Sequence, residues 1–194
     1  MRSEDSDYDV LMFLDRDRID TLMIHPDTRI LAQSNFSSSG TYFKGFDNVT
    51  MDGEGKYLRV VENCVIDPAT STLVLGTTNS VIPNDGSVRS IGSYAFYQCY
   101  PMAKIIIPES VDSIGDHAFY ACQALSEIEF NSELKSIGDY AFAYAKLENL
   151  VIPEGVQVIG GNSFMTAFCR ALRDVGYTTS TVKQAIFTVK MKVN

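Results

Sequence analysis

The stretch Ile91-Gly-Ser-Tyr-Ala-Phe96 decides the fold, because it recurs farther along the chain. The copies are Ile114-Gly-Asp-His-Ala-Phe119, Ile137-Gly-Asp-Tyr-Ala-Phe142 and, more weakly, Ile159-Gly-Gly-Asn-Ser-Phe164. They follow one another at spacings of 23, 23 and 22 residues. Such a short fixed period predicts a solenoid of stacked coils, each of which contacts only its neighbours.

Each period also holds one short segment in which apolar residues alternate. These pairs are Ile105/Ile107, Ile128/Phe130 and Leu150/Ile152. Alternation with period two predicts short strands that stack side by side in a parallel sheet. A turn former follows each strand, namely Pro108, Asn131 and Pro153.

The Ile-Gly-x-x-Ala-Phe stretch is expected to return the chain along the far side of each coil. Its isoleucine and phenylalanine should point inward, so we expect Phe96, Phe119 and Phe142 to form one buried stack. The glycine of each copy is expected to permit a backbone conformation closed to other residues. These glycines are Gly92, Gly115, Gly138 and Gly160.

The repeated unit reads Leu-x-x-Ile-x-Ile-Pro-x-Ser-Val-x-x-Ile-Gly-x-x-Ala-Phe-x-x-Cys. Over about residues 80–165 it resembles the BspA-type leucine-rich repeats of bacterial surface proteins. The resemblance implies a right-handed solenoid for adhesion or protein interaction, usually outside the cell, and not an enzyme. Cys99 and Cys122 match the cysteine column of that family, but Ala145 and Ala167 replace it later, so a bridge there is not general.

The expected fold class is an α/β repeat, with caps covering the ends of the solenoid. Residues 1–56 lack the repeat and are expected to form a β-rich segment with a short helix or two. Residues 57–165 are expected to hold a capping hairpin, over 57–76, and the solenoid. Residues 166–194 combine helical spacing with a later alternating run, which predicts a helix plus a strand as the C-terminal cap.

Composition excludes several classes of function. The 194 residues carry a net charge of −8, which argues against a partner held through its phosphates. No apolar run is long enough for membrane insertion, and residues 1–7 lack the apolar core of a signal peptide. No Cys-x-x-Cys pair or hydrolase motif occurs, and His117 lies at a variable repeat position without a nucleophile to recruit it. No catalytic residue, cofactor or metal site is therefore predicted.

The candidate binding face is the outward side of the strands. Its residues are expected to form two rows, one of Lys104, Glu127 and Asn149 and one of Ile106, Glu129 and Val151. An ion pair between Lys104 and Glu127 is expected across the sheet. Such a mixed surface suits a protein or peptide, although the same residues also fit an ordinary solvent-facing strand.

A second candidate surface is an aromatic strip beside His117. It consists of Tyr94, Tyr97, Tyr120, Tyr140 and Tyr144. Exposed tyrosines suit protein recognition, but the rings could instead merely cover the returning segment.

The leading hypothesis is a non-catalytic binding or adhesion module of a bacterial surface protein. Its partner would be a protein or peptide, with host and matrix proteins among the candidates, and neither nucleic acid nor membrane insertion is expected. The alternative is a structural or assembly component that self-associates through the solenoid. A third hypothesis is an enzyme within residues 1–56. An extracellular or cell-surface location follows from the resemblance alone, so a cytoplasmic one stays open.

Overall fold

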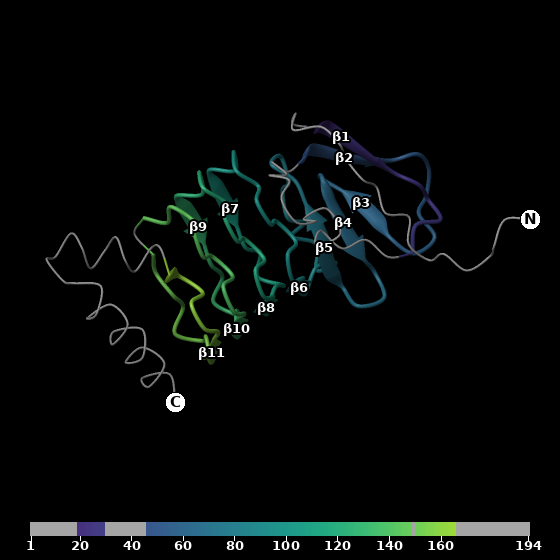
Figure 1. The fold of residues 1–194 in the computed structure, drawn as a ribbon. Helices are drawn as coiled ribbons and strands as arrows, with labels where there is room; N and C mark the ends of the chain where they lie inside the picture. The colour runs from purple at the N-terminus through teal and green to yellow at the C-terminus, as the bar shows by residue number, and fades with distance from the viewer. Residues whose placement is uncertain (1–18, 30–45, 149, 166–194) are drawn as a thin grey trace, which may run out of the picture.

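The computed structural model describes residues 19–29, 46–148 and 150–165. These residues form a β-solenoid whose coils stack side by side (Figure 1). No helix is present in the described ranges, so the helical part of the expected α/β class is not found there. The expected C-terminal helix and strand, over 166–194, lie outside the described residues.

The larger of the solenoid's two sheets is built from the Ser-Ile pairs of the repeat. Its short strands are β6 (Ser90–Ile91), β8 (Ser113–Ile114), β10 (Ser136–Ile137) and β11 (Val158–Ile159). They pair in parallel, with each isoleucine opposite the next. The sequence analysis expected these residues to return the chain but did not predict that they form a sheet.

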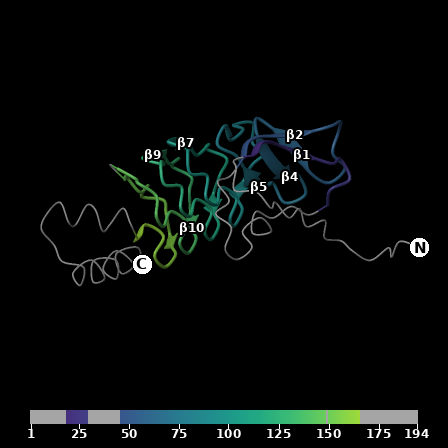
Figure 2. The same cartoon turned by 45° about the horizontal axis from the view of Figure 1, so that its top comes forward.

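The predicted parallel strands form a second, smaller sheet. It contains β7 (Lys104–Ile106) and β9 (Glu127–Glu129), paired with Lys104 opposite Glu127 and Ile106 opposite Glu129. This pairing confirms the predicted register for two coils. Residues 150–152, at the corresponding place in the next coil, form no strand. In both views β7 and β9 lie on one side of the solenoid and β10 on the other (Figures 1 and 2).

The N-terminal part adds strands at one end of the solenoid. The chain forms β3 (Arg59–Val61), β4 (Cys64–Asp67) and β5 (Thr72–Gly76), an antiparallel meander that joins the larger sheet through β5 and β6. The expected hairpin over 57–76 thus contains one turn more than expected. The extra turn lies at Glu62 and Asn63, which have φ values of 48° and 61°, as a tight hairpin turn requires.

A parallel pair of strands packs against this meander. They are β1 (Ile19–Ile24) and β2 (Phe46–Met51). Leu22, Ile24, Phe46 and Val49 form a buried cluster with Leu58, Val65 and Leu75. The meander therefore contributes to two cores, one facing β1 and β2 and the other inside the solenoid.

A ladder of phenylalanines forms the centre of the solenoid. Phe96, Phe119 and Phe142 are fully buried, with ring centroids 4.8 and 5.0 Å apart and nearly parallel planes. This confirms the predicted stack. Phe164 extends the ladder at 5.2 Å from Phe142, so the weaker fourth copy of the repeat forms a coil as well.

The repeat glycines allow the backbones of neighbouring coils to approach each other closely. The expectation that they adopt a special backbone conformation was wrong. None of the four has a positive φ. A Cβ on Gly138 would lie 2.6 Å from the backbone nitrogen of Asp116 in the preceding coil. The left-handed conformation falls two residues later, on Tyr94, His117 and Tyr140, with φ between 54° and 63°.

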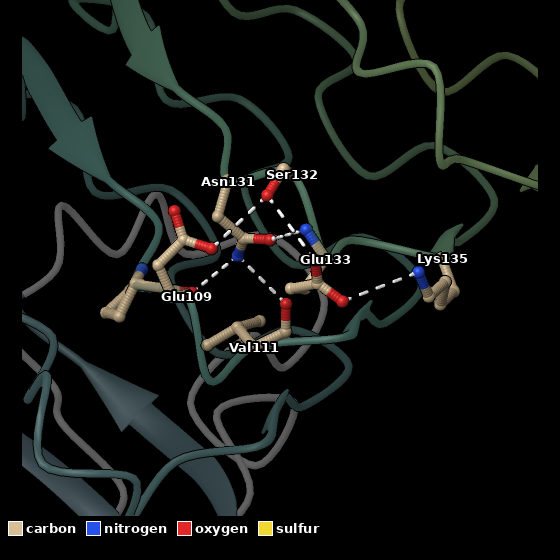
Figure 3. Close-up of polar contacts among 7 residues, drawn as sticks. Glu109, Val111, Asn131, Ser132, Glu133 and Lys135 are labelled. Atoms are coloured by element: carbon tan, nitrogen blue, oxygen red, sulfur yellow. Dashed lines mark hydrogen bonds and ion pairs between the residues drawn. The ribbon is translucent and has the colours of Figure 1, made fainter.

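Asn131 ties the turn after β9 to the preceding coil (Figure 3). Its buried side chain donates hydrogen bonds to the carbonyl oxygens of Pro108 (2.5 Å) and Val111 (2.9 Å). Its Oδ1 accepts a hydrogen bond of 2.7 Å from the Glu133 amide. The predicted turn former therefore also links two coils, which a proline at this position could not do through a side chain.

Candidate binding surfaces

The outer side of β7 and β9 carries the predicted charged row. The Lys104 Nζ lies 3.6 Å from Glu127 Oε2, as expected, and 2.5 Å from Glu129 Oε1, which was not expected. The hydrogen bond and the charge of Glu129 raise the pKa of Lys104 above its usual value. Because Lys104 contacts both carboxylates, it joins the two rows into one charged cluster. Asn149, the third member of its row, lies outside the described residues.

The second row exposes aliphatic side chains on either side of Glu129. Ile106 is 54% exposed and Val151 78% exposed. The row also continues in the other direction, because Val81 precedes Ile82-Pro83 as Ile106 precedes Ile107-Pro108 and is 62% exposed. The binding face predicted from the sequence lacks Val81, although Val81-Ile82-Pro83 resembles the strand of a first, irregular repeat.

The predicted aromatic strip is a continuous cluster of rings. His117 stacks between Tyr94 and Tyr140, at centroid distances of 4.9 and 5.1 Å. Tyr97 stacks on Tyr120 at 5.3 Å, and Tyr144 meets Tyr120 edge to face at 5.2 Å.

Most rings of this cluster are half-buried, and only Tyr144, at 46%, is exposed. Burial raises the pKa of Tyr97 and Tyr120 above the ordinary value of tyrosine. His117, at the variable repeat position, is half-buried between its two neighbouring rings. The cluster therefore covers the returning segment and leaves part of its surface, most of all Tyr144, in contact with solvent.

A shallow groove crosses the larger sheet, and the sequence analysis missed it. It has a volume of about 510 Å³ and runs over the Ser-Ile-Gly segments of β6, β8 and β10 and over Val158 and Gly160 at β11. Gly92, Gly115, Gly138 and Gly160 are among the residues that line it. Asp116 lines one side, where its Oδ1 accepts a hydrogen bond of 2.7 Å from the Asp139 amide. The Ser-Ile-Gly sequence that recurs in successive coils could have indicated this groove.

The groups that could carry chemistry do not converge in the described part of the chain. No cluster of three histidine, cysteine or acidic side chains suited to a metal ion occurs there. Cys64 and Cys122 are buried free thiols, and Cys99 is buried as well. Burial raises the pKa of Cys64 to about 12, so this thiol is held in its neutral, unreactive form. Among the same residues, no helix has the length and apolar character needed to cross a bilayer.

The repeat geometry agrees with a known family. The model of the BspA type leucine rich repeat region matches residues 76–192 in six copies. The chain belongs to this family. The match confirms the resemblance noted in the sequence and accounts for the stacked coils, the phenylalanine ladder and the glycine column in one repeated unit.

Two solved structures of other proteins are similar to this chain. The pneumococcal vaccine antigen PcpA is 19% identical with a TM-score of 0.61, and the match covers 73% of this chain and 35% of PcpA. At this identity the likeness shows the fold alone.

A leucine rich cell surface protein from Faecalibacterium prausnitzii A2-165 is 27% identical with a TM-score of 0.56. That match covers 71% of this chain and 37% of the other. The chain thus corresponds to little more than a third of either protein. No curated protein matches it.

Proposed function

We propose that this chain is a non-catalytic protein-binding module of a bacterial surface protein, used in adhesion. The observation that carries the proposal is the exposed face of β7 and β9, where Ile106 and Val151 flank the cluster of Lys104, Glu127 and Glu129. Exposed aliphatic groups beside charges suit a protein interface, because burial of the former drives association and the latter select the partner. A sheet of stacked coils presents these groups on a rigid support.

The family supports the location and architecture of the proposed module. BspA-type repeats occur in bacterial surface proteins, and the relative from Faecalibacterium prausnitzii is described as a cell surface protein. We propose a right-handed solenoid over 57–165, preceded by a β-rich segment over 1–56 and closed by a helix and a strand over 166–194. Each part would keep the core of the coils from solvent.

The proposed partner is a protein or peptide, with host and matrix proteins as the first candidates. The net charge of −8 opposes contact with nucleic acid, because no excess of basic residues is present to neutralise phosphates. The tyrosine strip would provide a second contact surface.

The test reverses the charge of the proposed face. The double variant Glu127→Arg with Glu129→Arg would place two cations beside Lys104. Its binding to a panel of immobilised host extracellular-matrix proteins is compared by surface plasmon resonance with that of the unmodified chain. We expect the unmodified chain to bind at least one protein of the panel and the variant to lose at least ten-fold in affinity.

The matched control is Asp52→Arg with Glu54→Arg, which makes the same change of charge on the exposed loop after β2. It should retain binding, and both variants should keep the melting temperature of the unmodified chain. Equal affinity of the two variants would place the contact surface elsewhere, with the tyrosine strip next to be tested. An unmodified chain that binds no matrix protein would contradict this class of partner.

Self-association is the second candidate function. It is favoured by the exposed aliphatic side chains of Val81, Ile106 and Val151, which would be buried if the same face of a second copy packed on them. Light scattering during size-exclusion chromatography separates the two functions. A defined oligomer that dissociates in the Ile106→Arg variant would favour assembly, and a monomer at all concentrations would exclude it.

A further inference from the structure

A cleft interrupts the row of exposed aliphatic residues before β7. It has a volume of about 340 Å³ and lies between the segment 80–84 and β7. Val81 and Ile82 line one wall, and Lys104, Ile105, Ile106 and Pro108 line the other. Ile82 and Ile105 are buried, whereas Val81 and Ile106 stand at the opening.

The cleft exists because the segment 80–84 is bonded to the meander and not to β7. The Ser80 hydroxyl contacts the Thr77 amide (2.7 Å) and the Asn63 carbonyl, and the Val81 amide donates to the Glu62 carbonyl at 3.1 Å. The chain from Pro83 to Val88 is also two residues longer than the chain from Pro108 to Val111. The extra turn at Glu62 and Asn63 thus draws this coil away from its neighbour.

As a result, β7 pairs along one edge only, with β9, among the residues that the structure describes. On that side the Ile107 amide donates to the Glu129 carbonyl at 2.8 Å. Because main-chain groups alternate along a strand, the amide and carbonyl of Ile106 face the cleft. Within the described residues no backbone hydrogen bond joins the segment 80–84 to β7. An unpaired strand edge is a template for another strand.

The surroundings of the cleft favour one sign of charge. Lys104 is the cation at its wall, and Glu127 and Glu129 outnumber it. Residues 61–169 contain four basic and twelve acidic residues, a net charge of −8. A basic segment is therefore attracted to this side of the solenoid, and an acidic segment is repelled.

We propose that the cleft binds an extended, basic peptide segment of the partner protein by strand addition to β7. The peptide main chain pairs with Ile106. On the outward side of the added strand, one aliphatic side chain packs between Val81 and Ile106, and the basic side chains two residues before and after it lie on the same face as Glu127 and Glu129. A three-residue strand offers about 10 Å of edge, so the contact involves a short segment. This inference rests on the proposed binding function and specifies how the partner is held.

The main-chain part of the proposal is tested with a defined peptide on the full chain. The probe is acetyl-Lys-Val-Val-Val-Lys-amide, in which both lysines and the central valine share the outward face, and the readout is hydrogen exchange of the Ile106 amide by NMR. We expect the peptide to slow this exchange at least ten-fold. The same peptide with N-methylated valines cannot donate to the Ile106 carbonyl, and its methyl groups keep the two main chains apart, so it should give no protection. Equal protection by both peptides, or none by either, would overturn strand addition.

The side-chain part is tested with two matched variants. Val81→Arg and Val158→Arg place the same side chain at similarly exposed positions, 62% and 59%, but only Val81 lines the cleft. Val81→Arg should weaken the basic peptide at least ten-fold, and Val158→Arg should leave its affinity unchanged. Equal effects of the two variants, or equally tight binding of a peptide with glutamate in place of lysine, would contradict the proposal.

These outcomes are distinct from those of the proposed function. If the chain binds matrix protein through Glu127 and Glu129 but Val81→Arg does not change this binding, the proposed function is supported and the cleft is excluded as the binding site. If the chain binds the peptide at Ile106 but binds no matrix protein, the cleft is supported as a peptide-binding site and matrix proteins are excluded as the partner.

Discussion

Phe119 lies between two other phenylalanine rings, at centroid distances of 4.8 and 5.0 Å, and is fully buried. Phe119→Ala should lower the free energy of unfolding by about 3–5 kcal/mol, because it removes buried surface and leaves a cavity inside the ladder. Denaturant titration followed by circular dichroism measures this loss. Val158→Ala, at an exposed position, should change the same quantity by less than about 0.5 kcal/mol. Similar losses for the two variants would show that the ring is not in the core.

Asn131 is the residue whose structural role is hardest to infer from its type. Asn131→Ala would leave the buried Val111 carbonyl oxygen without its donor and would remove one of the two hydrogen bonds to the Pro108 carbonyl, which also accepts from the Val111 amide. The expected cost is about 1–3 kcal/mol of unfolding free energy, measured by the same titration. Ser132→Ala is the control, because the exposed Ser132 hydroxyl makes only long contacts of 3.4 and 3.5 Å, and it should be nearly neutral. A neutral Asn131→Ala would mean that solvent satisfies the Val111 carbonyl oxygen.

At the scale of strands, the sequence predicted the spacing of the coils but not all of the pairing. The register of β7 and β9 followed from alternating apolar residues, because inward and outward positions differ in polarity. The two-residue strands at Ser90, Ser113 and Ser136 are too short to show an alternation of apolar residues. They can be recognised as strands only from their pairing with the equivalent residues of the adjacent coils.

The turn at Glu62 and Asn63 escaped prediction for a different reason. It lies within an unbroken β-rich run, and Glu62 is not a residue that favours a positive φ. The role of the repeat glycines was likewise not visible in the sequence, because a need for close approach and a need for a left-handed backbone select the same residue. Only the position of the neighbouring backbone distinguishes them.

The two proposed surfaces were accessible to prediction to different degrees. Repeat spacing placed Lys104 beside Glu127 and grouped the tyrosines, since equivalent positions of successive coils are neighbours. The contact between Lys104 and Glu129 depends on a side-chain rotamer, and the cleft depends on how the first coil is anchored. Neither is encoded in the period of the repeat.

For the whole molecule, the buried thiols and phenols predict a loss of stability at alkaline pH. Burial raises the pKa of Cys64 from 9.0 to about 12 and also raises those of Cys122, Tyr97 and Tyr120. The unfolded chain therefore releases these protons at a lower pH than the folded chain. Their contribution to stability is complete below about pH 9 and falls as the pH rises toward 12.

Thermal melts between pH 7 and 11 measure this decline. Cys64→Ala should show a shallower decline than the unmodified chain above pH 9, because one of the raised groups is gone. Superimposable pH profiles of the two proteins would show that the Cys64 thiol is not protected from ionisation by the fold.

The stacked rings of Tyr97 and Tyr120 also make the solenoid its own optical probe. The chain contains ten tyrosines and no tryptophan, so its near-ultraviolet absorption and emission come mainly from phenol groups. Half of these phenols belong to one ring cluster that spans three coils. Transitions of rings held at fixed distances couple to one another, and the coupling disappears when the coils separate. The ellipticity of these bands therefore reports the docking of one coil on the next without any added label.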